Sequence, residues 1–231
     1  MIKKIIIILA VFLAGCTSNK TLKHPLDKSK SKTVVLENGL KVYLLSDPSF
    51  NVSAASVSVE VGSLDNPDDR QGLAHFLEHM LFLGTEKYPD VDEYSSYLKT
   101  YGGYSNAYTA SDHTNYQFQV LPDGFEGALD RFSQFFISPL FTEEYTAREV
   151  NAVNSEHQKN MLNDNWRQFR ISSLFAKDGH PERKFGTGNL ETLGDITREE
   201  LIRFYKQHYS ANRMGVALLS THSLKEMESW C

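Results

Sequence analysis

The sequence predicts an α/β (α+β) fold in which a mostly antiparallel sheet packs against helices. Short segments with alternating apolar and polar residues, typical of strands, are interspersed with longer segments that carry an apolar stripe, typical of helices. Turn residues and helix-capping patterns separate these segments. With 231 residues, 41% of them hydrophobic, the chain is long enough to bury a substantial core.

Strands are predicted from alternation and from turn signals. Residues 33–45 indicate two strands joined at Asn38-Gly39, which is a strong hairpin signal. Residues 52–61 alternate and predict a third strand. The remaining predicted strands are an antiparallel pair and a buried strand: 104–109, 115–121 and 214–220.

Helices are predicted mainly from capping boxes, in which a short polar residue is followed three positions later by Glu. A helix over 72–84 is expected to end at Gly84, a favourable C-cap. A long helix is expected from about Glu143 to beyond Met161. The capping boxes open four further helices: Asp90 with Glu93, Asp123 with Glu126, Thr197 with Glu200, and Ser223 with Glu226.

Charge and cysteine content exclude several classes of function. The net charge is −5 and there is no long basic block, so a nucleic-acid partner is not expected. The two cysteines, Cys16 and Cys231, form no C-x-x-C pair, which excludes a cysteine zinc site or a dithiol redox motif.

The pattern H-x-x-E-H within the predicted helix 72–84 is the strongest functional signal. His75 and His79 are four residues apart, so both imidazoles share one helix face and can bind one Zn²⁺. Glu78 lies beside them, placed to touch a metal-bound water rather than the metal. The alternative is a helix with two partly buried histidines. However, this helix is apolar almost all round, and unpaired buried polar groups are costly, which favours the metal site.

Residues 71–163 resemble the inverzincin peptidases of the insulinase–pitrilysin family, and the resemblance extends from about Val34 to the end of the chain. In that family H-x-x-E-H is followed, after 76 intervening residues, by a glutamate that is the third zinc ligand. Here residues 80–155 separate His79 from Glu156, which matches this spacing.

The resemblance implies the N-terminal catalytic domain of a zinc metalloendopeptidase that hydrolyses oligopeptides. One Zn²⁺ per chain is expected on His75, His79 and Glu156, with a fourth position open for water. Glu78 is expected to transfer protons as the general base and acid. Glu149 lies two turns before Glu156 on one helix face and is expected to support the metal site; the alternative for Glu149 is a solvated surface charge.

Substrate contacts are also implied by the resemblance. In the family, a strand that matches residues 105–109 is an exposed edge that pairs with extended peptide backbone. Asn106 and Ala107 are therefore candidate substrate-binding residues.

Several aromatic and histidine residues have two interpretations. Phe82, Trp166 and Phe169 could line the cleft or lie in the core, and the core is favoured for Phe82. His113 and His157 could be rival ligands, but His157 points about 100° away from Glu156 around the helix and His113 has no partner at ligand spacing. Both are expected to be structural or surface residues.

The N-terminus predicts export and lipidation. Residues 1–16 have two lysines, a short apolar core and the sequence Leu-Ala-Gly-Cys, which resembles a bacterial lipoprotein signal with Cys16 as the lipidated residue. Thr17 points to the periplasmic face of the outer membrane as the location in the cell envelope. An ordinary secretory signal is the alternative. Residues 17–32 are expected to form a polar tether and 33–231 the catalytic domain.

The end of the sequence suggests that this domain is C-terminally incomplete. Family enzymes are far longer, about four homologous domains that enclose small peptides, whereas this chain stops soon after the capping box at Ser223. One hypothesis is a catalytic domain whose activity needs the missing family domains. The other is a non-catalytic zinc- or peptide-binding lipoprotein remnant.

Overall fold

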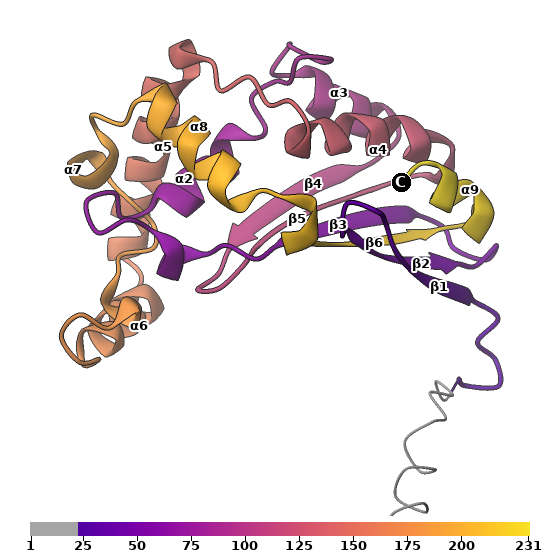
Figure 1. Cartoon of the computed structure of the whole chain (residues 1–231), viewed down its shortest axis with the longest axis horizontal. Helices are drawn as coiled ribbons and strands as arrows, with labels where there is room; N and C mark the ends of the chain where they lie inside the picture. Colours follow the sequence, from indigo (N-terminus) through magenta and orange to yellow (C-terminus); the bar gives the residue numbers. More distant parts are fainter. Residues whose placement is uncertain (1–22) are drawn as a thin grey trace, which may run out of the picture.

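The computed structural model describes residues 23–231, in which six strands form one mixed sheet of order β1-β2-β6-β3-β5-β4 (Figure 1). Every neighbouring pair is antiparallel except β2 and β6, which are parallel. The predicted fold class is therefore confirmed. The strands are β1 (Lys30–Val35), β2 (Lys41–Ser46), β3 (Ser53–Val59), β4 (Tyr104–Thr109), β5 (Thr114–Val120) and β6 (Met214–Ser220).

The strands form because alternating residues cover the core on one face of the sheet. In β3, Ala55, Val57 and Val59 are buried, while the residues between them are partly exposed. β4 is an edge of the described sheet, since it pairs only with β5, where Asn106 lies opposite Gln117. Its outer backbone groups remain available for another strand.

The helices are divided between one face of the sheet and one end of it. In Figure 1, α3 and α4 lie over the strands, whereas α2, α5, α6 and α7 gather beyond the end toward which β4 points. The helices are α2 (Leu73–Met80), α3 (Glu93–Thr100), α4 (Phe125–Ser133), α5 (Glu143–Met161), α6 (Asp164–Leu174), α7 (Leu190–Leu193), α8 (Arg198–His208) and α9 (Leu224–Ser229).

An aromatic cluster joins the helices to the sheet. Phe118 on β5 packs edge-to-face on Phe132 of α4, with ring centroids 5.1 Å apart. Phe135, after α4, lies 4.9 Å from Tyr94 of α3. These rings are buried in the core, and their packing fixes α3 and α4 on the sheet.

The hairpin and two of the four capping boxes are confirmed. Gly39 has φ +87° between β1 and β2, as the hairpin turn requires. Thr197 and Ser223 both accept a hydrogen bond from the third residue of their helices, and the glutamate side chains bond back. β1 begins at Lys30, three residues earlier than predicted, because its backbone pairs with β2 as far as Ser46.

The capping boxes predicted at Asp90 and Asp123 are wrong. Asp90 instead accepts a hydrogen bond from the amide of Asp92, and α3 begins only at Glu93. Asp123 lies within a 3-10 turn, so α4 begins at Phe125 without a side-chain cap. At both positions, the aspartate that was expected to cap the helix instead forms part of a tight turn that precedes it.

Two helix ends also differ from the prediction. α2 ends at Met80, and shorter-range turns continue the chain to Gly84, which has the positive φ (+95°) expected of a C-cap glycine. α5 ends at Met161 rather than beyond it. The side chain of Asn163 then caps a new helix, α6, by accepting two amide hydrogen bonds.

The N-terminal predictions concern a different part of the chain. The expected signal peptide, Cys16 and residues 17–22 of the expected tether lie outside the described residues. Within residues 23–231, no helix has both the length and the apolar character needed to cross a membrane.

Candidate metal centre

Helix α2 presents two imidazoles on one face. It follows Gly72, and its apolar residues anchor it in the core. The rings of His75 and His79 lie almost perpendicular, with centroids 4.8 Å apart. Their side chains are 13% and 26% exposed, so both rings remain reachable from one side while their helix is buried.

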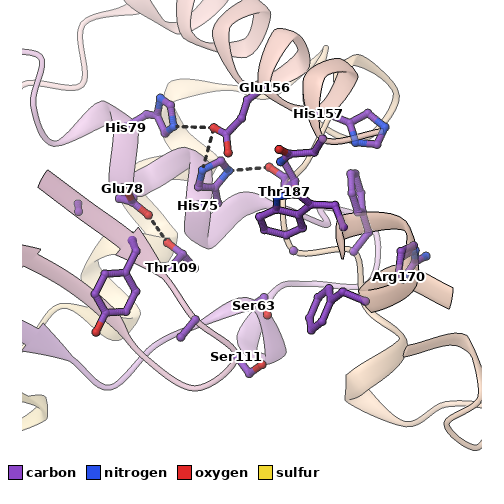
Figure 2. Close-up of a pocket in the computed structure, with 18 of the residues that line it drawn as sticks. Ser63, His75, Glu78, His79, Thr109, Ser111, Glu156, His157, Arg170 and Thr187 are labelled. Atoms are coloured by element: carbon purple, nitrogen blue, oxygen red, sulfur yellow. Dashed lines mark hydrogen bonds and ion pairs between the residues drawn. The ribbon is translucent and has the colours of Figure 1, made fainter. Parts of the chain in front are cut away.

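Glu156 of α5 completes a three-residue group (Figure 2). Its Oε2 lies 3.5 Å from Nε2 of His75 and 3.7 Å from Nε2 of His79. All three candidate ligand atoms lie within 4.8 Å of one another. Tetrahedral zinc holds its ligands at about 2.1 Å, which places neighbouring ligand atoms about 3.4 Å apart. The donor types and their spacing therefore fit a zinc ion.

The other ring nitrogen of each histidine has its own partner. Nδ1 of His75 lies 2.8 Å from the carbonyl oxygen of Thr187, and Nδ1 of His79 lies 3.3 Å from Oε2 of Glu149. A carbonyl only accepts, so Nδ1 of His75 must donate. Such contacts orient an imidazole and leave Nε2 free to bind metal.

The carboxylates also control the charge of His79. Burial alone would lower the pKa of His79, but hydrogen bonds to Glu149 and Glu156 outweigh it and raise the pKa to about 9. The same hydrogen bonds lower the pKa of Glu149 and of Glu156. Without metal, the site therefore holds a proton on His79 at neutral pH. Metal binding must displace this proton.

Glu78 occupies a different environment on the same helix. Its side chain is buried, and burial raises the pKa of Glu78. Thr109, at the end of β4, donates a hydrogen bond of 2.5 Å to Oε2 of Glu78 and partly offsets this effect. Figure 2 shows Glu78 pointing away from Glu156 toward the strand that carries Thr109. A carboxyl with a raised pKa in a cleft is suited to proton transfer.

A cavity of about 1460 Å³ contains the group and extends along β4 and α6. Asn106 and Ala107 line it, as do Trp166 and Phe169, which are 45% and 60% exposed. Phe82 both lines the cavity and packs on the core, so its two interpretations hold together.

The two rival histidines do not join the group. His113 pairs with Asp112 and with the hydroxyl of Tyr108. His157 lies on the cavity wall, where its ring contacts Phe185 at 4.9 Å. Both fit the expected structural or surface roles.

Two contacts of the site were missed by sequence reasoning. The Thr187 contact uses a backbone carbonyl, which leaves no trace in the side-chain pattern. Thr109 is the last residue of a predicted strand, and its side chain points toward the helices. The alternation along residues 104–109 could have indicated this direction, but it could not have identified Glu78 as the partner of Thr109.

Comparisons with known proteins agree on one family. The family model described as insulinase (peptidase family M16) matches residues 41–178. The Arabidopsis thaliana protein named insulin-degrading enzyme-like 1, peroxisomal, is 50% identical over 214 residues, which cover 90% of this chain and 22% of that protein. The Homo sapiens insulin-degrading enzyme is 48% identical over 216 residues, 90% of this chain and 21% of that protein.

A solved structure gives the same result for the fold. The crystal structure of pitrilysin superposes with a TM-score of 0.87 and 38% sequence identity, over 92% of this chain and 23% of that one. The chain thus spans about a fifth of the length of the relatives it matches.

Proposed function

Because this chain belongs to the insulinase family of peptidases, we propose that it is a zinc metalloendopeptidase domain that hydrolyses oligopeptides. The observation that carries the proposal is the convergence of His75, His79 and Glu156 beside the buried carboxyl of Glu78. The relatives are far longer, so hydrolysis by this chain and the identity of its peptides belong to the proposal.

Nε2 of His75, Nε2 of His79 and the carboxylate of Glu156 would hold one Zn²⁺. When bound, zinc supplies a Lewis acid that polarises the peptide carbonyl and acidifies the attacking water. Glu78 accepts the proton of that water and delivers it to the departing amine nitrogen. Glu149 holds the imidazole of His79 in its metal-binding orientation.

The edge strand β4 supplies a place for the peptide. Its backbone has a partner strand on one side only, and Asn106 and Ala107 lie where β4 borders the cavity. An extended peptide that adds to this edge gains main-chain hydrogen bonds without a strict side-chain requirement. Its scissile bond would then lie along the wall that carries Glu78.

Hydrolysis of an internally quenched peptide tests the function. The zinc-loaded chain should cleave it, and Glu78→Gln should lose about 10² to 10⁴-fold in rate while still binding zinc. Glu86→Gln, an exposed glutamate close in sequence, is the matched control and should keep full activity. A folded, zinc-loaded chain that cleaves nothing would contradict hydrolysis by this chain alone. It would leave a catalytic domain that needs further family domains, or the alternative, a non-catalytic zinc- or peptide-binding lipoprotein.

We also propose that Cys16 carries the lipid that anchors the chain to the bacterial cell envelope, at the periplasmic face of the outer membrane. The support is the lipoprotein-like signal of residues 1–16. In a bacterial host, metabolic labelling with a fatty acid should mark the wild-type chain and Cys231→Ser but not Cys16→Ser. Equal labelling of all three chains would contradict the assignment.

A further inference from the structure

One segment far along the chain, residues 184–190, lies against the start of the ligand-bearing helix α2. Nζ of Lys184 donates a hydrogen bond of 3.0 Å to the carbonyl of Leu64. The amide of Phe185 donates one of 2.6 Å to the side chain of Gln71. We call residues 184–190 the bridging segment. It begins beyond the part of the chain that the family model matches.

The bridging segment also contacts α5, the helix of the third candidate ligand. The ring of Phe185 packs edge-to-face on His157, which follows Glu156 directly. The amide of Leu190 donates a hydrogen bond of 3.3 Å to the side chain of Asn154. The segment therefore joins the two helices that carry the whole candidate ligand set.

Within the bridging segment, the carbonyl of Thr187 accepts the Nδ1 proton of His75 at 2.8 Å, as Figure 2 shows. In a neutral imidazole, this contact places the lone pair of His75 on Nε2, the nitrogen that faces Glu156. The metal-binding tautomer of His75 is therefore selected by a backbone group 112 residues away in the sequence.

Two glycines allow the carbonyl to come this close. A Cβ at Gly72 would lie within 2.3 Å of Cα of Gly188, and a Cβ at Gly188 would lie 2.5 Å from Cδ1 of Leu193. Both glycines have positive φ, +91° and +82°. Gly72 immediately precedes α2 and Gly188 immediately follows Thr187, so this backbone contact sets the distance between Thr187 and His75.

We propose that Thr187 is a positioning residue of the metal site, acting through its backbone carbonyl, and that the Gly72–Gly188 contact holds this carbonyl in place. The proposal rests on the proposed zinc site. Loss of such a contact typically weakens metal binding by about 10 to 100-fold, because the imidazole is no longer fixed in its binding orientation and tautomer.

The test compares two glycine substitutions in the purified full chain. Gly188→Ala introduces a Cβ that would lie 2.5 Å from Cδ1 of Leu193 and 3.3 Å from Cα of Gly72, which pushes Gly188 away from this contact. Gly179→Ala introduces a similar positive-φ strain (+76°), but its Cβ would have no atom within 4 Å. Zinc dissociation constants are measured by competition with a chromophoric chelator. Gly188→Ala should weaken binding about 10 to 100-fold. Gly179→Ala should stay within about twofold of the wild type, since the added Cβ would meet no other group.

A second variant and a spectroscopic measurement cover the case in which Gly188→Ala does not fold. Gln71→Leu removes the acceptor of the Phe185 amide without backbone strain, and it should also weaken zinc binding. Long-range ¹H–¹⁵N NMR of the metal-free wild-type chain at pH 8 should show the His75 proton on Nδ1. A proton on Nε2, or wild-type zinc affinity in a folded Gly188→Ala or Gln71→Leu chain, would overturn the proposal.

These outcomes separate the proposal from the function on which it rests. A wild-type chain that binds no zinc at all would contradict the proposed function. The NMR measurement needs no metal, so it would still decide whether the Thr187 carbonyl fixes the tautomer of His75.

Discussion

Replacing Glu149 by glutamine should weaken zinc binding more at pH 9 than at pH 7. The carboxylate of Glu149 has two opposite effects on the metal site, because it orients His79 for the metal and also stabilises the proton that competes with the metal. The balance between these effects changes with pH, which makes the substitution informative.

The size of the proton effect follows from the pKa of His79. With a pKa of about 9, His79 is protonated at pH 7 in the metal-free chain. Each pH unit below 9 then costs zinc a factor of about ten in apparent affinity, so the wild type loses about 100-fold, or about 2.7 kcal/mol, at pH 7. Glu149→Gln lowers the pKa of His79 and removes part of this penalty.

The orienting effect has the opposite sign. Loss of a carboxylate behind a ligand imidazole costs about 10 to 100-fold in metal affinity. At pH 9 little proton competition remains, so this loss should appear in full. At pH 7 the relief of proton competition offsets much of it, and the net loss should be less than about tenfold.

The assay is chelator competition between pH 6.5 and 9, with chelator constants corrected for pH. Glu144→Gln, an exposed residue on the same helix, is the control and should follow the wild type throughout. A ratio of dissociation constants that is independent of pH, or larger at pH 7 than at pH 9, would refute the account of Glu149 and His79.

Three further predictions concern stability and the cavity. In the metal-free chain, the raised pKa of His79 stabilises the fold fully below pH 6.5, and this stabilisation is lost as the pH rises through about 9. The free energy of unfolding in urea should therefore fall over that range, and an increase would contradict the prediction. Thr109→Val should shift the acidic limb of the pH profile of kcat/KM to higher pH by roughly 1 to 2 units, because Glu78 loses a charge-assisted hydrogen bond. Thr109→Ser keeps the hydroxyl and should show the wild-type profile. An acidic limb that stays in place in Thr109→Val would contradict this role of Thr109. Trp166→Ala and Phe169→Ala should raise KM for peptides but change the free energy of unfolding by less than about 0.5 kcal/mol, since the two residues are 45% and 60% exposed and neither belongs to the buried core. A large loss of stability would place them in the core instead.

The parts of the fold that depend on local sequence were predictable. The capping boxes at Thr197 and Ser223 involve residues three positions apart, so the pattern alone specifies the contact. Those at Asp90 and Asp123 failed because a neighbouring turn changes the backbone before the helix begins. The end of α5 depends on Asn163, whose role as a cap becomes clear only once the next helix is known.

Some residues of the candidate site were likewise predictable from the sequence, whereas others depend on the tertiary fold. His75 and His79 are placed together by helix periodicity, and the family spacing singles out Glu156, which the fold then brings to both imidazoles. The carbonyl of Thr187 had no sequence signal, because any residue has a carbonyl and only the fold decides where it points. The order of the strands, with β6 inserted between β2 and β3, likewise depends on tertiary packing.

The most direct test of the account is anomalous X-ray scattering from crystals of the zinc-loaded chain, collected on both sides of the zinc absorption edge. We expect one strong zinc peak per chain, about 2.1 Å from Nε2 of His75, from Nε2 of His79 and from the carboxylate of Glu156. No zinc peak at these three residues, or a peak bound through Glu78 instead, would contradict it.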